Sequence, residues 1–343
     1  MNHVWSVPGC ESPWGLFSGI NPVLDTALGT RRRRVSVQHE RIAPSLRPRS
    51  GAARLTGSPH TDRARASEPG GGGGASAKLR LMTAHHPASD DDGRRVLITG
   101  ASSGIGAALA VELARRGDTV GIVARRTDRL GQVLEACRVH APASQMWPGD
   151  VGEPDAAATI VAGALDTFGR IDVLVNNAAI PGVCHATRLD AATVARVMDV
   201  NFHAPVRFTL AALPHMLERG SGAIVNVSSL GGRLGILRES AYCASKFAVC
   251  GWTESLQLDL WDTPLRVKLI IPGAVDTEIW EHPDAEPASY DGPKMPVDEV
   301  AVAIADAIDD DGFEYYIPDM KAIAVFKTEH IDRYLTSSYE ALC

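Results

Sequence analysis

Long apolar runs and paired cysteines are missing from this 343-residue sequence. No segment approaches the roughly 18 uninterrupted apolar residues that a membrane-spanning helix needs, and the N-terminus has no basic region followed by an apolar stretch. The six cysteines show neither CxxC pairs nor ligand-like spacing, which argues against a disulfide framework and against a zinc site. These absences predict a soluble, non-secreted, cytoplasmic protein that holds no metal.

Basic charge is also scarce over most of the chain. The sequence has 34 Lys and Arg against 41 Asp and Glu, a formal net charge of -7, yet residues 1–81 carry 12 basic and 5 acidic residues. The acidic remainder argues against nucleic acid as a partner. Hydrophobic residues make up 45% of the sequence, enough to fill a sizeable core, so we expect a globular protein.

Residues 1–93 show no sustained hydrophobic period and contain Arg31 to Arg34 and a glycine run from Gly70 to Gly74. This composition predicts a disordered N-terminal extension. Three explanations stay open: a transit peptide, a nucleic-acid-binding arm, or upstream sequence that is not part of the natural protein, with Met82 as a candidate start. Residues 94–343 are expected to form a single folded domain.

Beyond this extension, apolar runs alternate with amphipathic segments, a pattern typical of parallel strands joined by crossover helices. Strands are predicted near Arg95–Thr99, Thr119–Ala124, Gln145–Asp150, Val173–Asn176, Ala223–Ser228, Arg266–Ile271 and Glu314–Ile317. Helices are predicted around Gly104–Arg116, Arg126–Val139, Pro154–Phe168, Ala191–Glu218, Ala241–Trp261 and Pro296–Asp309. The first and fourth strands are apolar without alternation, which indicates a sheet covered on both faces. The sequence therefore predicts an α/β, doubly wound fold.

A glycine-rich loop follows the first predicted strand. Residues 99–106 read TGASSGIG and run directly into a helix. Glycine lets the chain turn sharply and lets the backbone approach a pyrophosphate, while the unpaired N–H groups at the start of a helix favour an anion. The loop therefore predicts a dinucleotide phosphate site. Packing within a strand-to-helix turn is the alternative reason for its glycines.

Arg125 and Arg126 follow the second strand, where a fold that prefers NAD usually has an acidic residue for the ribose 2′-hydroxyl. An arginine can instead pair with a 2′-phosphate through charge-assisted hydrogen bonds. We therefore expect NADP(H) as the cofactor, NAD(H) being less expected, with Arg125 as the main contact and Arg126 as a second candidate. Two solvated arginines at the start of a helix are the alternative interpretation.

Tyr242 and Lys246 stand four residues apart on a predicted helix, so their side chains lie on one face. The ordinary pKa of tyrosine is about 10, and a neighbouring ammonium favours the phenolate. Together with the positive charge of an oxidised nicotinamide, Lys246 is expected to lower the tyrosine pKa into a useful range for proton exchange. A Tyr-x-x-x-Lys pair is common by chance, however, and needs supporting context.

The strand at residues 223–228 supplies that context, because it ends in the hydroxyls of Ser228 and Ser229 at the edge of the sheet where ligands bind. Ser229 could hydrogen-bond a substrate oxygen on which charge develops during hydride transfer. Ser228 is expected to be structural, bonded to the backbone. A hydroxyl, a phenol and an ammonium are thus predicted to meet at one edge.

The motifs in their order and spacing resemble the short-chain dehydrogenase/reductase family over about residues 94–318. Those that carry the resemblance are the glycine loop, Asn176-Asn177-Ala178-Ala179, Ser229 and Tyr242-x-x-x-Lys246. The resemblance implies a seven-stranded parallel sheet in a single Rossmann-type domain that often forms a homodimer or homotetramer. It also implies that Asn201 completes a catalytic tetrad with Ser229, Tyr242 and Lys246, its backbone holding a water of a proton relay. A helix-bending or capping role is the alternative for Asn201.

The resemblance further implies cofactor contacts. Asp150 and Val151 match the pair that contacts adenine, Asn176 matches the residue beside the adenine ribose, and residues 272–277 match the segment that holds the nicotinamide amide. The expected cofactor-binding residues are Gly100, Ser102, Ser103, Gly104, Ile105, Gly106, Arg125, Arg126, Asp150, Val151, Asn176, Ala178, Tyr242, Lys246, Pro272, Gly273, Val275 and Thr277. The sequence departs from the family at Ala179, where glycine is more usual, and at Ser103, where many NADP-preferring members have a basic residue.

Together these features predict an NADP(H)-dependent oxidoreductase that moves a hydride between nicotinamide and a small or medium apolar carbonyl compound or its alcohol, with Tyr242 as general acid or base. A non-catalytic NADP(H)-binding sensor or scaffold is the competing function. Residues 278–295 are expected to form a substrate lid, with Trp280 and Tyr290 as wall residues. Packing within the loop is the alternative role for these two aromatic side chains.

Overall fold

The computed structural model describes residues 93–281 and 286–342, and all of them belong to one compact unit. The extension predicted for residues 1–93, with its candidate start Met82, lies outside the described residues except for Gly93. His282, within the predicted lid, lies outside them as well.

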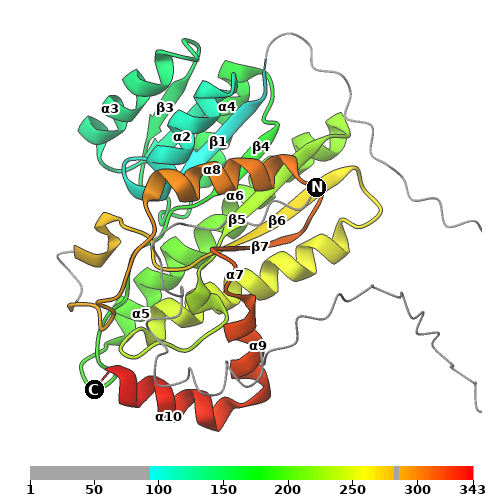
Figure 1. The fold of residues 1–343 in the computed structure, drawn as a ribbon. Helices are drawn as coiled ribbons and strands as arrows, with labels where there is room; N and C mark the ends of the chain where they lie inside the picture. The colour runs from blue at the N-terminus through cyan, green and yellow to red at the C-terminus, as the bar shows by residue number, and fades with distance from the viewer. Residues whose placement is uncertain (1–92, 282–285, 343) are drawn as a thin grey trace, which may run out of the picture. The chain divides into compact units, whose positions relative to one another are not determined.

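Seven strands form one parallel sheet in the order β3-β2-β1-β4-β5-β6-β7 (Figure 1). Their bounds are β1 Arg95–Thr99, β2 Thr119–Ala124, β3 Gln145–Pro148, β4 Val173–Asn176, β5 Gly222–Val227, β6 Leu265–Pro272 and β7 Glu314–Ile317. The strand order reverses beside β1, between β1 and β4, as in a doubly wound sheet. The predicted fold class is confirmed.

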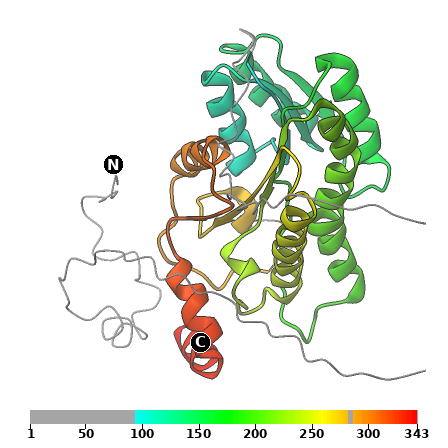
Figure 2. The same cartoon turned by 90° about the vertical axis from the view of Figure 1, so that its right-hand side faces the viewer.

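Helices cover both faces of this sheet, as the view along its edge shows (Figure 2). They are α2 Gly104–Arg115, α3 Thr127–Arg138, α4 Ala156–Phe168, α5 Ala191–Met198, α6 Ala204–Arg219, α7 Ser240–Asp259, α8 Val297–Asp309, α9 Lys321–Glu329 and α10 Ile331–Leu342. Short 3-10 helices span Leu230–Gly232 and Glu278–Glu281. Within the described residues, none of the helices combines the length and the apolar character needed to cross a bilayer.

The two faces of the sheet bury separate hydrophobic clusters. Val96 and Ile98 of β1 pack in the cluster that includes α2, α3 and α8, whereas Leu97 between them packs in the cluster that includes α4, α6 and α7. Successive side chains of a strand point to opposite faces, so a strand covered on both sides has apolar residues at consecutive positions. This explains why residues 96–98 of β1 and 173–175 of β4 are apolar without alternation.

The single helix predicted at Ala191–Glu218 is interrupted in the structure. A π-helical turn at Asp199–His203 separates α5 from α6. One extra residue in a helical turn leaves the local backbone hydrogen bonds out of register, and such bulges are frequent at functional sites. The prediction of a continuous helix was wrong at this point because apolar periodicity does not register one inserted residue.

Two helices that were not predicted, α9 and α10, follow β7. Tyr334 of α10 is buried and packs with Leu234 and Ile323, and its hydroxyl donates to the carbonyl of Gly235 at 2.7 Å. The C-terminal helices therefore lie against the loop between β5 and α7. A helical signal was present in the sequence, since Ile331 and Leu335 recur at a spacing of four residues.

Asp172, just before β4, gathers donors from three parts of the fold. Its carboxylate accepts from the backbone N–H of Arg95 at 2.6 Å and from the guanidinium groups of Arg170 and Arg219 at 3.0 and 2.5 Å. Burial disfavours the charged form, but these hydrogen bonds outweigh burial and hold the pKa of Asp172 below its ordinary value of 3.8. Ionised Asp172 therefore ties the start of β1 and the end of α6 to β4.

We expect Asp172→Asn to lower the free energy of unfolding by about 2 kcal/mol near neutral pH. Because the folded pKa is depressed, the contribution of Asp172 is complete above its unfolded pKa and is lost as the pH falls through the lower folded value. Urea unfolding at about pH 7 and about pH 3 should therefore show a difference between wild type and variant that shrinks in acid. Asp262→Asn, at an exposed position, is the control; a difference independent of pH would contradict this account.

Candidate active site

The predicted site residues gather at one edge of the sheet, because each follows the carboxyl end of a parallel strand or begins the helix after it. The glycine loop follows β1, Arg125 follows β2, and Ser229 follows β5. Residues 272–277 continue from the end of β6. In an open α/β sheet, ligands bind outside this edge, near the point where the strand order reverses.

The glycine loop is built for close backbone approach. Gly100 has φ +72°, and a Cβ there would lie 2.6 Å from Cα of Ala178; a Cβ on Gly106 would lie 2.4 Å from the carbonyl oxygen of Gly100. Helix α2 begins at Gly104, and no side chain caps its N-terminus. Its first N–H groups therefore remain available to an anion, as a dinucleotide pyrophosphate requires.

The segment after β6 lies against this loop. A Cβ on Gly104 would come within 3.1 Å of Cγ2 of Thr277, so the threonine side chain borders the start of α2. Val275 forms a parallel bridge with Met295, and its carbonyl accepts from the indole N–H of Trp280 at 2.7 Å. The residues expected to hold the pyrophosphate and the nicotinamide of a dinucleotide are thus brought side by side.

The two arginines after β2 point to different partners. Arg125 lies 3.7 Å from the carboxylate of Asp150, whereas Arg126 donates to the hydroxyl of Ser103 at 2.6 Å and also bonds Ser102 and Glu278. Arg126, the second candidate for the 2′-phosphate, therefore lies over the glycine loop. Both side chains remain about half exposed, so both can reach a bound anion.

Asp150 and Asn176 are held by the protein itself. The Asp150 carboxylate accepts from Arg196 at 2.6 Å and from the N–H of Gly152 at 2.9 Å; burial opposes its charge, but these bonds keep its pKa below the ordinary value. The Asn176 amide is buried and donates to Thr209 and Asn226 at 3.1 and 2.9 Å. The expectation that Asn176 contacts a ribose is therefore limited to its backbone, since its side chain lies within the sheet.

Asn177, which the sequence reasoning did not assign, fastens the glycine loop. Its amide donates to the carbonyls of Thr99 and Gly100 at 3.0 and 3.3 Å, and its N–H donates to the Thr99 hydroxyl at 3.0 Å. The N–H of Ala178 donates to the same hydroxyl at 3.2 Å. The sequence feature that could have indicated this role is a second asparagine directly after β4, opposite a threonine at the end of β1.

Ser229, Tyr242 and Lys246 meet in the structure. The Tyr242 phenol lies close enough to the Ser229 side chain for that side chain to lower its pKa, and Oγ of Ser229 accepts from the N–H of Gly231 at 3.1 Å. Lys246 is 2% exposed, its Nζ lies 5.7 Å from the centroid of the Tyr242 ring, and it donates to the carbonyl of Val227 at 3.0 Å. Ser228 bonds the carbonyl of Lys246 at 3.1 Å, which matches its expected structural role.

The pKa of Tyr242 depends mainly on burial. Burial raises it above the ordinary value of 10, and the Ser229 side chain opposes this rise only in part. Burial also lowers the pKa of Lys246 to about 8, because a buried ammonium loses its hydration. In the protein alone, burial has the larger effect on the pKa of Tyr242, and the amino group of Lys246 donates to a backbone carbonyl. The lowering expected from Lys246 together with an oxidised nicotinamide stays a prediction.

Asn201 lies in the π-helical turn and is fully buried. Its Oδ1 accepts from the N–H of Ile180 at 2.8 Å, and its Nδ2 donates to the carbonyl of Ile180 and to Oγ of Ser245, each at 3.0 Å. The side chain thus ties the segment after β4 to the helix that carries Tyr242. The predicted role of the Asn201 backbone in a proton relay stays a prediction.

The described lid residues pack on one another. The rings of Trp280 and Tyr290 lie 5.7 Å apart, and Nζ of Lys294 lies 4.7 Å from the Trp280 centroid. The Tyr290 hydroxyl donates to the carbonyl of Pro293 at 2.5 Å. These contacts favour loop packing, the alternative role of the two aromatic residues, over a substrate wall.

The C-terminal helices reach the same edge of the sheet. A Cβ on Gly273 would lie 2.8 Å from the sulfur of Met320, the residue before α9. Met320 packs in turn in the cluster of Leu230 and Leu234, from the loop that follows Ser229. This segment therefore forms an apolar boundary beside the candidate site.

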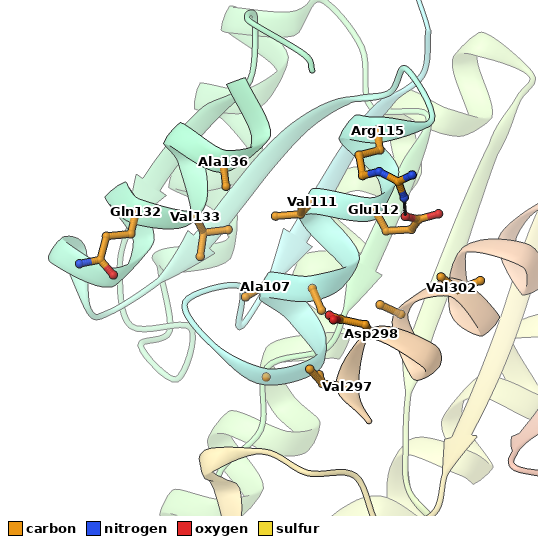
Figure 3. A pocket seen from close by; sticks show the side chains of 13 residues that line it. Ala107, Val111, Glu112, Arg115, Gln132, Val133, Ala136, Val297, Asp298 and Val302 are labelled. Atoms are coloured by element: carbon orange, nitrogen blue, oxygen red, sulfur yellow. Dashed lines mark hydrogen bonds and ion pairs between the residues drawn. The ribbon is translucent and has the colours of Figure 1, made fainter. Parts of the chain in front are cut away.

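A hollow of about 640 Å³ lies elsewhere, between α2, α3 and α8 (Figure 3). Ala107 and Val111 of α2, Val133 of α3 and Val302 of α8 line it. Gly104 is the one lining residue that also belongs to the expected cofactor site. The hollow is on the outer side of α2 and holds no part of the predicted tetrad.

Comparisons with known proteins agree on the kind of protein this is. A family model described as short chain dehydrogenase matches residues 94–287. An uncharacterized oxidoreductase, YxnA, of Bacillus subtilis (strain 168) is 38% identical over 238 residues, which is 67% of this chain and 67% of that protein.

Two solved structures resemble the chain in fold. A short-chain dehydrogenase/reductase from Burkholderia phymatum in complex with NAD has a TM-score of 0.65 at 26% identity, covering 70% of this chain and 95% of the other. A short-chain dehydrogenase from Sphingobium yanoikuyae in complex with NADPH has a TM-score of 0.62 at 30% identity, covering 71% and 95%.

We expect Asn201→Asp to destabilise the fold by about 2 to 3 kcal/mol, because a carboxylate cannot donate to the Ile180 carbonyl or to Ser245 and would face both as a buried charge. Thermal or urea unfolding measures the loss. Gln132→Glu makes the same chemical change at an exposed position and should cost far less. Equal stability of the two variants would show that the Asn201 contacts do not hold the site.

Proposed function

Since this chain belongs to the short-chain dehydrogenase/reductase family, we propose that it is an NADP(H)-dependent oxidoreductase that interconverts a carbonyl compound and its alcohol. The observation that carries the proposal is the meeting of Ser229, Tyr242 and Lys246 at the carboxyl edge of the sheet, beside the glycine loop. A non-catalytic sensor would need the loop alone. The assembly of a hydroxyl, a phenol and an amine beside it supports an enzyme.

A nicotinamide dinucleotide supplies or accepts the hydride when bound. The glycine loop fits its pyrophosphate, because Gly100 and Gly106 leave no room for a Cβ and the N-terminus of α2 has no side-chain cap. Thr277 and its neighbours after β6 would hold the nicotinamide end. Arg125 and Arg126 would hold a 2′-phosphate, since both keep about half of their surface exposed at the end of β2.

Tyr242 would move the proton that accompanies the hydride. In reduction, its hydroxyl gives a proton to the substrate oxygen, which the Ser229 hydroxyl also hydrogen-bonds as negative charge builds there. In oxidation, the phenolate takes the proton back. Lys246 stabilises the phenolate when its amino group is charged. Because the pKa of Lys246 is about 8, the amino group is mostly protonated at neutral pH.

Tyr242→Phe is expected to lower kcat at least about a hundredfold, because phenylalanine fills the same space and has no proton to transfer. The assay is oxidation of NADPH with a panel of ketones, with binding of NADPH measured separately by calorimetry. Tyr339→Phe, at an exposed position of α10, should leave the rate unchanged. If Tyr242→Phe retains the wild-type rate on a substrate of the enzyme, the proposed role of the phenol is refuted.

The choice between NADPH and NADH tests the arginines. Arg125→Ala should reduce the ratio of kcat/KM for NADPH to that for NADH at least about tenfold, since a charge-assisted contact to the 2′-phosphate is lost. Arg126→Ala shows whether the second guanidinium shares this contact. Arg138→Ala, at the end of α3, is the control. A wild-type preference for NADH would overturn the NADP(H) assignment while leaving the hydride chemistry in place.

A further inference from the structure

Glu239, the residue before α7, is a buried carboxylate without a partner. Its side chain belongs to a residue that is 8% exposed, and it forms no hydrogen bond or ion pair within residues 93–281 and 286–342. Burial raises the pKa of Glu239 to about 7, because the charged form loses hydration and gains no partner. A buried acid without a partner is costly to ionise, and such a group calls for an explanation.

The backbone beside Glu239 is arranged so that the acid turns inward and the neighbouring base turns outward. Arg238 has φ +65°, a left-handed conformation that no other non-glycine residue among those described adopts. Its side chain is exposed, and its carbonyl accepts from the N–H of Cys184 at 2.7 Å. The nearest cation in sequence is thus directed to solvent and does not neutralise Glu239.

Glu239 lies on the same side of α7 as Tyr242 and Lys246, since the three residues are spaced by three and four positions. Lys246 is one turn deeper, on the side expected to meet the nicotinamide ribose. Glu239 is one turn the other way, toward the start of the helix. The carboxylate and the reacting phenol influence each other, because the charge of Glu239 adds to the rise in the pKa of Tyr242.

Two titratable groups among the described residues feel the charge of Glu239, the Tyr242 phenol and the Cys243 thiol. Neither of them is a cation.

We propose that Glu239 is a specificity-determining residue, which selects carbonyl or alcohol substrates that carry an ammonium group about one helical turn, roughly 5 to 6 Å, from the reacting carbon. A substrate cation would supply the missing partner of the carboxylate and would orient the carbonyl toward Tyr242 and Ser229. The inference rests on the proposed hydride-transfer function and adds the substrate class. Its physical basis is the strength of a charge pair that is shielded from water.

The experiment compares ketones that differ only in charge. The pair is 5-(dimethylamino)pentan-2-one with 6-methylheptan-2-one, because the four bonds between nitrogen and carbonyl carbon let the extended amine span one helical turn. For the wild-type enzyme with NADPH, the ratio of kcat/KM for the amine to that for its uncharged counterpart should be at least about ten. Glu239→Gln keeps the size of the side chain and should remove most of this preference.

Two further variants make the result specific. Glu239→Asp retains the charge on a shorter side chain and should retain part of the preference, which a purely structural role would not require. Glu135→Gln, an exposed acid on α3, should not change the ratio. The proposal is overturned if Glu239→Gln lowers kcat/KM equally for the amine and its uncharged counterpart, or if the wild-type ratio is near one. In either case the proposed ketone reduction itself still stands.

A binding measurement separates this inference from the proposed function. Calorimetry on the protein saturated with NADP⁺ compares 5-(dimethylamino)pentan-2-ol with 6-methylheptan-2-ol, with no turnover required. A preference for the amine that Glu239→Gln abolishes and Tyr242→Phe preserves would support the carboxylate site even if no ketone were reduced. Absence of such a preference would overturn the inference whether or not the enzyme is active.

Discussion

Parallel pairing forces the residues that follow β1, β4, β5 and β6 onto one edge of the sheet. Val96 of β1 pairs with Val173 of β4, and Val173 pairs with Ala223 of β5, so the strands stay level and their carboxyl ends meet. The glycine loop, the asparagines after β4 and Ser229 are separated by more than 120 residues of sequence but share this edge. The site is therefore a consequence of strand direction before any side chain is considered.

A buried polar network then fixes the helices against the sheet. The Asn176 amide of β4 reaches Thr209 of α6 and Asn226 of β5, and the Asn226 amide reaches Thr253 of α7 at 2.9 Å. Hydrogen bonds have narrow geometric tolerance compared with apolar contacts, so they select one position of each helix. The position of Tyr242 on α7 thus depends on asparagines that do not touch it.

The sequence was most informative where periodicity and chemistry agree. Four strands, β1, β2, β4 and β7, have the predicted bounds, because each is a short apolar or β-branched run that ends in a turn signal. The glycine loop and the Tyr242–Lys246 pair were found because their spacing has a chemical reason. The structure brings the three predicted groups Ser229, Tyr242 and Lys246 together, although their catalytic roles remain predictions.

What the sequence could not provide depends on side-chain direction and on burial. Spacing does not show that Asn176 turns into the sheet while Asn177 holds the glycine loop, or that Arg126 reaches across to Ser103. Nor does it show that a charged residue such as Glu239 is buried, since an acid before a helix is ordinarily solvated. The π-helical turn at Asp199–His203 escaped notice because one inserted residue leaves hydrophobic periodicity almost intact.

The C-terminal helices have a further consequence for how this protein can diversify. The matched family region ends at residue 287, whereas α9 and α10 come later and still pack on the loop after Ser229 through Leu234 and Tyr334. Met320 also borders the backbone at Gly273. Mutations in this tail can therefore reshape the boundary of the candidate site without altering the residues expected to perform the chemistry, so substrate range and reaction type can evolve separately.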